Sequence, residues 1–436
     1  FQQELRPLNL TGFNTAPGFL QRGGLPSIGN PPSTPAAARA ASSSYTSDFR
    51  QPETYSWALS YQRELSRTMA LELRYLGTRS RHLPIQMWLN PGIPPVTETN
   101  FVPTFFSQPT AAQLAGLTPV STFLAARRLD NPAFGILTAY DPIGNSQYDG
   151  LAANVTRRLS DGLSFTASYT FSKTISDSDN EVFSSVANPR RPQNNLNIRD
   201  QRALSDNDIP HRFVVGFTYD LPRFSDNAFA KALLGNWNLS GIYQAQSGQP
   251  FTPQSGIDSN LNQDPAGDRT ILNPNGVPGT GSPVCAVNSA GQFLTSTGAV
   301  TTNINTCRPG AGTAVAYFAI NPNAQYIQAG LGARANAGRN TLRSNMISRT
   351  DAAITKRFPF GDDSMYNVEI GAEINNLFNQ RIFAIGNFGN ALGTATAPGL
   401  SPTDTAFPTV SSPFFNQYSL GNYPGRTVQL RAKLNF

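Results

Sequence analysis

Apolar and polar residues alternate along nine short segments of the chain. In the clearest one, Leu163, Phe165, Ala167, Tyr169 and Phe171 alternate with serine and threonine. Successive side chains of a β-strand point to opposite faces, so this pattern predicts a strand with one apolar and one polar face. The other segments lie at about 54–62, 69–75, 151–159, 213–219, 237–246, 347–358, 366–375 and 426–436. The sequence therefore predicts an all-β protein built from antiparallel strands.

The connections between these segments differ in length in a regular way. Those after the first, third, fifth and seventh strands are short or moderate. Those after the second, fourth, sixth and eighth are long, at about 77–145, 173–210, 247–344 and 378–424. Residues 1–50 contain proline, glycine, alanine and serine clusters without a sustained period, and we expect an irregular loop there.

This sorting of loops favours a membrane protein over a soluble sandwich. An outer-membrane β-barrel has short periplasmic turns at one end and long extracellular loops at the other, whereas a β-sandwich has no reason to sort its loops. We therefore predict an antiparallel up-and-down transmembrane β-barrel. Residues 51–436 would supply its strands, and residues 1–50 would be extracellular.

Aromatic residues support the same orientation. Outer-membrane barrels carry aromatic girdles where the strands cross the two membrane interfaces. The predicted outer girdle contains Tyr55, Trp57, Tyr169 and Phe171, and the predicted periplasmic girdle contains Tyr219, Trp237, Tyr366 and Phe436. For any one of these aromatic residues, the alternative to a place in a girdle is simple packing in a protein core.

The number of strands has a further consequence. With the C-terminus on the periplasmic side, nine strands place the first residue outside the cell. A complete bacterial barrel has an even number of strands. We therefore expect the chain to be the C-terminal part of a longer barrel, in which the ninth strand pairs with the eighth on one side only.

Composition narrows the class of protein further. The charged fraction is 14%, and the net charge of +6 comes without a cluster of lysine and arginine, so we do not expect nucleic-acid binding. No run of eighteen apolar residues is present, which excludes a transmembrane helix but permits membrane-spanning strands. Residues 1–20 also lack the basic and apolar regions of a secretory signal.

Two cysteines lie in the longest predicted loop. Cys285 and Cys307 are 22 residues apart in a segment rich in glycine, threonine and asparagine. An exported protein folds in an oxidising compartment, so we expect a disulfide between them, with two free thiols as the alternative.

The same loop contains a weak candidate for calcium binding. Asp258, Asn260, Asn262 and Asp264 place oxygen atoms on every second residue, as in a calcium loop. However, Asn262 stands where a glycine would help the turn, and Arg269 stands where a bidentate glutamate is expected. The sequence favours a solvated Asn/Asp loop over a calcium site, and no cofactor is predicted.

No enzymatic signature is recognisable. The two histidines and the two cysteines do not form a zinc-binding or thiol-nucleophile pattern, and no nucleophile elbow or phosphate-binding glycine loop is present. We therefore predict that the protein is not an enzyme.

Several strand segments resemble a known family. Residues 55–83, 148–173, 209–221, 235–252 and 368–379, together with the terminal strand, are similar in order and pattern to the TonB-dependent transporters. The similarity is greatest to their Oar-like barrels. Each segment is a strand pattern rather than a catalytic signature.

This resemblance implies a barrel of about 22 strands with a plugged lumen, of which this chain would supply the last nine. It implies a location in the outer membrane of a Gram-negative-type bacterium, contact with membrane lipid, and uptake of a large scarce solute driven through TonB. The terminal strand, ending at Phe436, resembles the family's signal for the barrel-insertion machinery. The plug and the TonB-binding segment would lie outside this sequence, and the solute is not identified.

Two alternatives remain open. The barrel could be a structural or adhesive protein whose long loops, especially residues 247–344, bind a surface partner. A passive porin is the third hypothesis, and it requires an unplugged lumen.

Overall fold

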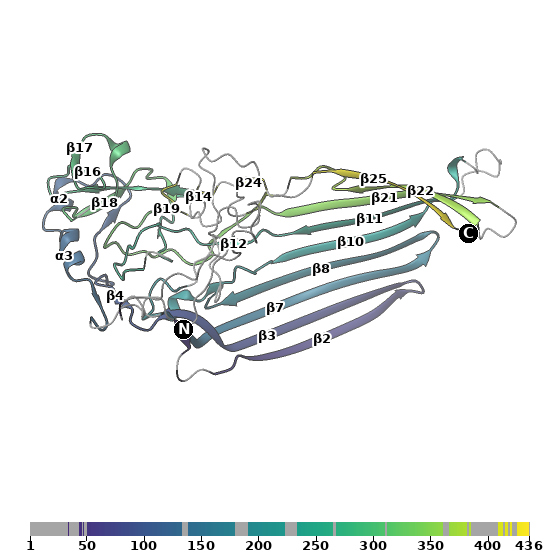
Figure 1. Cartoon of the computed structure of the whole chain (residues 1–436), viewed down its shortest axis with the longest axis horizontal. Coiled ribbons are helices and arrows are strands. Elements are labelled where there is room, and N and C mark those ends of the chain that lie inside the picture. Colours follow the sequence, from purple (N-terminus) through teal and green to yellow (C-terminus); the bar gives the residue numbers. More distant parts are fainter. Residues whose placement is uncertain are drawn as a thin grey trace, which may run out of the picture.

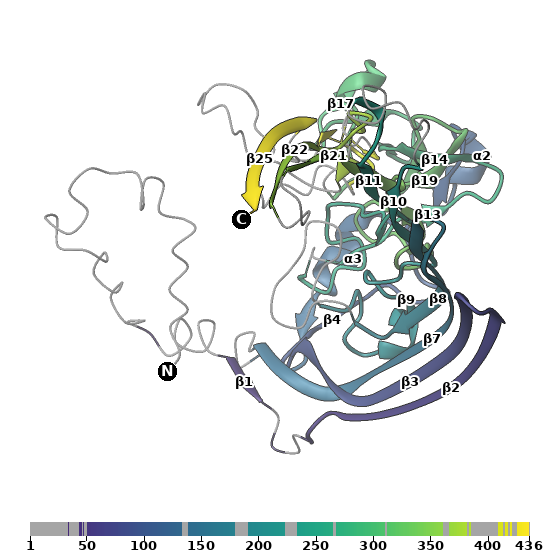
Figure 2. The same cartoon turned by 90° about the vertical axis from the view of Figure 1, so that its right-hand side faces the viewer.

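The fold is a long curved sheet with a folded cap at one end. The computed structural model describes residues 34, 43–45, 47, 50–132, 138–178, 191–222, 233–264, 267–309, 312–360, 366–381, 383–384, 409–412, 415–416, 419–420 and 425–435. In Figure 1 the cap lies at the left and the long strands run to the right. Figure 2 shows that the sheet is an open arc.

Nine long strands form the arc in sequence order, each antiparallel to the next. They are β2 (Glu53–Ser66), β3 (Met69–Trp88), β7 (Thr138–Ser160), β8 (Leu163–Ser176), β10 (His211–Asp220), β11 (Trp237–Gln246), β21 (Ile347–Phe360), β22 (Tyr366–Asn375) and β25 (Thr427–Asn435). Two short strands join its cap end, β1 (Ser43–Tyr45) beside β7 and β9 (Ala203–Leu204) beside β8. The predicted all-β, up-and-down antiparallel architecture is confirmed, and we call these nine strands the wall.

One face of the wall carries a continuous band of exposed apolar side chains. Across four neighbouring strands, Leu59 faces Tyr75, Tyr75 faces Leu151, and Leu151 faces Phe171. Leu59 is 73% exposed, and at the far edge Leu430 of β25 is 82% exposed. A face this apolar and this exposed matches a sheet that lies against hydrocarbon.

The opposite face is polar and is the concave one. Ser172 and Ser176, on the polar face of β8, are buried beneath cap segments. Ser172 Oγ donates to the Ile209 carbonyl at 2.9 Å, and Arg339 donates to Ser176. Figure 2 shows β4, β9 and helix α3 on the concave side of the arc. The apolar band therefore lies on the convex face.

Three wall strands are longer than the alternation predicts. The predicted loop at 77–145 is wrong at both ends, because β3 continues to Trp88 and β7 already begins at Thr138. Register shifts between Ser80 and Ile85 interrupt the period of two, and residues such as Ile85 are then buried by the cap. Alternation disappears there because neither face meets hydrocarbon. For the same reason β8 extends to Ser176, into the loop predicted at 173–210.

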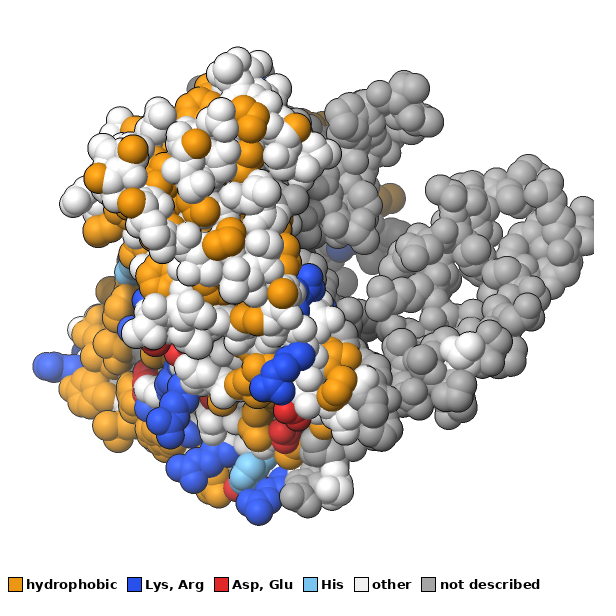
Figure 3. Space-filling model, turned by 90° about the vertical axis from the view of Figure 1, so that its left-hand side faces the viewer, with side chains coloured by type: hydrophobic (Ala, Val, Ile, Leu, Met, Phe, Trp, Pro, Cys, Tyr) orange, Lys and Arg blue, Asp and Glu red, His pale blue; other side chains and the backbone are white. Residues whose placement is uncertain are grey.

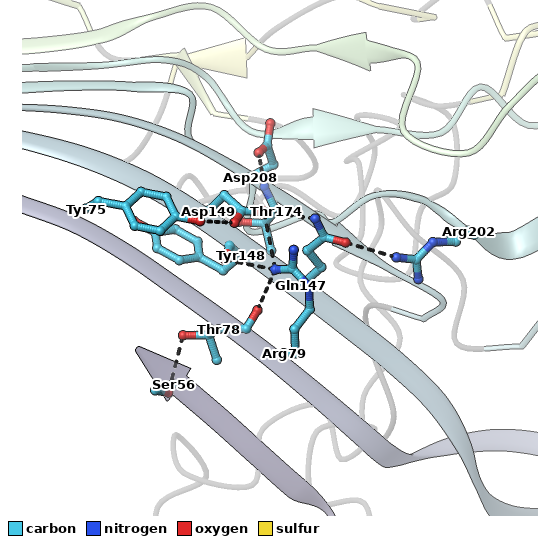
Figure 4. A network of polar contacts seen from close by, with 10 residues as sticks. All are labelled: Ser56, Tyr75, Thr78, Arg79, Gln147, Tyr148, Asp149, Thr174, Arg202 and Asp208. Carbon is cyan, nitrogen blue, oxygen red and sulfur yellow. Dashed lines mark hydrogen bonds and ion pairs between the residues drawn. The ribbon is translucent and has the colours of Figure 1, made fainter. Parts of the chain in front are cut away.

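A polar network marks the end of the apolar band towards the cap (Figure 4). Tyr75 Oη donates to Asp149 Oδ1 at 2.8 Å, and the Arg79 guanidinium lies 3.3 Å from Asp149 Oδ2. Arg79 also lies 5.3 Å from the ring centre of Trp57. On β8, the backbone N–H of Thr174 donates to Asp208 Oδ1 at 2.7 Å, which fixes the loop before β10 to the wall.

At the other end of the wall the β2–β3 and β7–β8 connections are tight. β7 turns into β8 through Asp161 and Gly162, whose φ angles are 50° and 77°. Two consecutive positive φ angles define the turn type that matches the twist of a two-stranded hairpin. Gly162 adopts this conformation without the steric cost that a side chain adds.

Each outer strand of the arc pairs on one side only within the part of the chain that the structure describes. β25 pairs with β22, and β2 pairs with β3. Phe436, the predicted assembly and girdle residue, lies outside the described residues. No helix among the described residues is long and apolar enough to span a membrane.

The remaining elements belong mainly to the cap. They are β4 (Gly92–Ile93), β5 (Thr104–Phe105), α2 (Ala111–Leu114), α3 (Val120–Ala125), β6 (Arg128–Leu129), η3 (Ile198–Gln201), β12 (Pro250–Phe251), β13 (Ile271–Leu272), β14 (Val277–Ser282), β15 (Val284–Val287), β16 (Phe293–Leu294), β17 (Val300–Thr301), η4 (Ile304–Thr306), β18 (Ala316–Ala319), β19 (Ala324–Ile327), β20 (Leu342–Arg343), β23 (Phe383–Ala384) and β24 (Ser419–Leu420).

Candidate functional site in the loop cap

The cap is a folded unit with its own buried core. The connection between β11 and β21, expected from the sequence as a loop at 247–344, contains a three-stranded sheet and four strands of a five-stranded sheet, whose fifth strand, β5, comes from the β3–β7 connection. The four residues of β15 and the four of β18 are all buried. A period of two cannot reveal such strands, because both of their faces are covered.

The two cysteines join within this core. Cys285 lies on β15 and Cys307 follows η4, and the two form a disulfide with a Cα–Cα distance of 5.0 Å. Both side chains are fully buried and pack with Leu114 of α2. The link therefore fastens the antiparallel β15–β18 pair and the turn at η4 to each other.

The predicted Asn/Asp loop is neither solvated nor built like a calcium site. Asp264 is 1% exposed and pairs with the Arg191 guanidinium, with a distance of 2.8 Å from Nη2 to Oδ1. Asp258 pairs with Arg127 at 3.2 Å. These oxygens bind guanidinium groups because the loop is packed inside the cap, where a carboxylate needs a partner to replace water.

The amide side chains of this loop are also engaged. Asn260 Nδ2 and Asn262 Nδ2 both donate to the Gln193 carbonyl, at 2.7 and 3.0 Å. Gln193 Oε1 in turn accepts from Arg269 Nε at 2.8 Å. Among the described residues, no group of three or more His, Cys, Asp and Glu is arranged to hold a metal ion. We therefore propose no calcium site here.

Next to this loop, Asp268 is a fully buried carboxyl group. Its Oδ2 accepts from the Ser259 hydroxyl at 3.1 Å, and its Oδ1 has no hydrogen-bond partner. Burial, followed by the negative charge of Asp258, raises the pKa of Asp268 well above its ordinary value. Burial likewise raises the pKa of Asp258. Compared with a carboxyl group in water, the buried carboxyl group of Asp268 therefore favours its protonated form.

A pocket of about 590 Å³ opens beside this cluster. Its polar lining consists of five amide side chains (Gln193, Asn194, Asn197, Asn260 and Asn336), two carboxylates (Glu98 and Asp200), two guanidinium groups (Arg269 and Arg334) and the hydroxyl of Thr97. The lining comes from the connections after β3, β8 and β11. Segments 94–98 and 193–200 adjoin β4 and β9, which lie on the concave side of the wall in Figure 2.

The chemistry of this pocket suits a polar solute. Amides offer both donors and acceptors, and planar guanidinium and carboxylate groups add charged ones. Glu98 and Arg334 form an ion pair at its margin. Of the residues selected from the sequence, only Asn260 lines the pocket. The run of amide residues at 193–197 was the only feature of the sequence that pointed to this pocket. An amide-rich loop has no periodic pattern, so the sequence did not show that these residues line a pocket.

The predicted girdle residues occupy two rows on the apolar face. Tyr55, Trp57, Tyr169 and Phe171 lie towards the cap ends of β2 and β8, and all four are more than 40% exposed. Tyr219, Trp237 and Tyr366 lie at the opposite ends of β10, β11 and β22. The register places all seven on the same face of the wall.

Comparison with known proteins places the chain among membrane β-proteins. A family model described as outer membrane beta barrel domain matches residues 3–429. No curated protein matches the chain.

Three solved structures are similar at low identity. The outer membrane transporter YddB from Escherichia coli is 8% identical with a TM-score of 0.34, and the match covers 77% of this chain and 30% of that one. The ferripyoverdine receptor of the outer membrane of Pseudomonas aeruginosa is 10% identical with a TM-score of 0.33, covering 88% and 27%. The ferric-catecholate import receptor Fiu from Escherichia coli K12 is 10% identical with a TM-score of 0.27, covering 82% and 36%.

The chain therefore spans about a third or less of the length of these three proteins. The family assignment rests on the family model alone.

Proposed function

The chain belongs to the family of outer membrane beta-barrel domains, and from this premise we propose that it forms part of the wall and cap of a TonB-dependent transporter. In such barrels the long loops are extracellular and the short turns periplasmic. The cap with its pocket would then face the medium, and β25 would end at the periplasmic side. The solute would be large and scarce, as the resemblance of the strand segments implies.

The observation that carries the proposal is the folded cap at one end of the wall, whose elements β4 and α3 lie on the concave side. A passive porin needs an open lumen, whereas here three connections converge into one packed unit that contains a polar pocket. Arg339 donates to the carbonyls of Ser176 and Gln201, which ties the β11–β21 connection to the β8–β10 connection. A cap held in this way can present a preformed solute site.

The membrane-facing roles follow from the same arrangement. We propose that Tyr55, Trp57, Tyr169 and Phe171 mark the outer interface, and Tyr219, Trp237 and Tyr366 the periplasmic one. The terminal strand is proposed to engage the barrel-insertion machinery through Phe436, and TonB would act through a part of the protein outside this sequence. No nucleic-acid partner is proposed.

The transporter proposal can be tested genetically in the native host. Deletion of the gene is expected to impair growth on a defined set of nutrients, and inactivation of the TonB system is expected to impair growth on the same set. The double mutant should grow no worse than the TonB mutant. An additive defect would contradict the proposal, as would large steady conductance of the purified whole protein in planar bilayers.

An adhesive barrel is the second candidate, and the disulfide-linked part of the cap favours it. This part has a buried core of its own around Cys285, Val287 and Phe318. Deleting residues 284–319 should abolish attachment but leave solute uptake intact if adhesion is the function. Loss of uptake with attachment unchanged would contradict adhesion.

A further inference from the structure

One region of the cap is almost free of charge. Residues 99–126 contain no Asp, Glu, Lys or Arg, and residues 270–333 contain only Arg308. In the chain as a whole, 14% of residues are charged. We call these two segments together the charge-poor lobe.

The two segments form one body. β5 pairs with β18 in parallel. The backbone N–H groups of Val120 and Ser121 donate to the carbonyls of Ala314 and Gly312, at 2.8 and 2.9 Å. Phe123 of α3 also packs in the same core as Val284 and Ile327. The scarcity of charge is therefore a property of a surface as well as of two stretches of sequence, and Arg308 is the one charged residue exposed among the described residues there.

The surface of the lobe is rich in hydroxyl and amide groups. Its exposed residues include Gln292, Ser296, Thr302, Asn303, Asn305 and Thr313. Two aromatic rings of the 99–126 segment, Phe101 and Phe106, are 38% and 39% exposed. Figure 3 shows the end face of the cap, where charged side chains gather in the lower half and uncharged atoms dominate the upper half.

The lobe is also rigid, which favours binding. The Cys285–Cys307 disulfide closes its central loop. Asn288 Oδ1 accepts from the backbone N–H groups of Ala290 and Gln292, and Asn303 Oδ1 accepts from that of Asn305. Groups that are already ordered lose less conformational entropy when a ligand binds.

The scarcity of charge on the lobe limits the kind of partner that can bind to it. A typical protein surface is about 25–35% charged residues. Charges on such a partner would lose water against this lobe without gaining an opposite charge, which is unfavourable. A neutral polysaccharide carries no charge, and its hydroxyl groups match the donors and acceptors of Ser, Thr, Asn and Gln.

We propose that the charge-poor lobe is a docking surface for an uncharged polysaccharide. This inference rests on the proposed extracellular position of the cap and does not depend on which solute is transported. Hydroxyl and amide groups would bind the sugar hydroxyls, and Phe101 and Phe106 would pack against the apolar faces of sugar rings.

The test is affinity electrophoresis of the purified whole protein in detergent. Native gels contain dextran or galactomannan as neutral probes, alginate as a polyanionic probe, or no polysaccharide. We expect at least one neutral probe to retard the protein, and the retardation to persist in high salt because no ion pairs are involved. Alginate should cause none.

Two charge-introducing variants sharpen this test. Ser296→Glu with Thr302→Glu alters exposed side chains and leaves the buried core unchanged. This double variant should weaken binding about tenfold, equal to about 1.4 kcal/mol. Asn207→Glu places a charge on an exposed loop residue outside the lobe and should bind as the wild type does.

Three results would overturn the proposal. They are no retardation by either neutral probe, stronger retardation by alginate than by the neutral probes, and equal loss of binding in the lobe variant and in Asn207→Glu. None of these results affects the genetic TonB test, so failure of this inference is distinct from failure of the transporter proposal.

Discussion

The wall and the cap use apolar residues in opposite ways. In the wall, Leu59 and Leu430 are 73% and 82% exposed on the convex face. In the cap, Val284, Tyr317 and Ile327 are fully buried. The wall therefore depends on interstrand backbone hydrogen bonds and on a lipid solvent, whereas the cap folds by excluding water.

This difference predicts which substitutions each region tolerates. Charge on the convex face of the wall should damage insertion, while loss of a buried partner should damage the cap alone. The following experiments measure the two regions separately. A heat-dependent shift in gel mobility reports whether the wall is folded, and limited proteolysis or thermal unfolding reports the stability of the cap.

The largest effect is expected for Arg191→Ala. It removes the guanidinium group that pairs with the buried carboxylate of Asp264 and stacks on Trp88. Removing a partner of a buried charge costs up to about 3–5 kcal/mol, so the cap should unfold at a lower temperature. As the control, Arg334→Ala breaks the exposed pair with Glu98 and should cost less than about 1 kcal/mol. Equal effects of the two variants would contradict this account.

A somewhat smaller effect is expected when the disulfide is removed. Cys285→Ser with Cys307→Ser opens a link across 22 residues of sequence, which should destabilise the cap by roughly 3 kcal/mol. Proteases should then cleave within residues 284–319 while the heat-modifiability of the wall stays unchanged. Reduction of the wild type should reproduce this pattern. Unfolding of the wall in the variant would show that the two regions are coupled.

In the wall, Leu73→Arg should impair insertion. Leu73 lies on the apolar face of β3, opposite Tyr61 of β2. An arginine on the lipid face costs about 2 kcal/mol or more near the middle of the membrane. Thr166→Arg, on the concave face of β8, is the matched control and should insert normally. The fraction of folded protein in isolated outer membranes measures both variants, and equal insertion would contradict the assignment of faces.

The smallest effect is a pH dependence of cap stability. The pKa of Asp268 is higher in the folded protein than in the unfolded chain, where it is about 3.9. The unfolded chain therefore loses its proton first as the pH rises. The contribution of Asp268 to cap stability should be greatest below about pH 4 and should decline as the pH rises towards the folded pKa.

Asp268→Asn should make this pH dependence weaker. Some dependence should remain, because burial raises the pKa of Asp258 in the same direction. Thermal unfolding of the cap at several pH values provides the measurement. An unchanged slope in Asp268→Asn would contradict the role of this carboxyl group.

Much of the wall could be predicted from the sequence because its two faces meet different solvents. Leu163 to Phe171 alternate with serine and threonine, and β8 forms where that alternation occurs. The predicted strand ends were wrong where the two faces of a strand no longer meet different solvents. Residues 77–88 continue β3 beyond the apolar band, but register shifts and burial by the cap remove the period.

The pocket and the ion pairs of the cap could not be predicted in this way. Arg191 and Asp264 are 73 residues apart in sequence, and no local pattern links them. The Asn/Asp loop was expected to be solvated because its residues are polar. It is buried because arginine side chains and the Gln193 backbone carbonyl, all from other connections, satisfy its carboxylates and amides.

The sequence by itself determined the strand order, the apolar face and the asymmetry of the connections, because these follow from local periodicity and loop length. Only the tertiary structure decided that the long connections fold into a packed cap, which side chains meet in its pocket, and that two separate uncharged segments share one surface. Those features depend on contacts between residues far apart in the chain, and such contacts leave no period in the sequence.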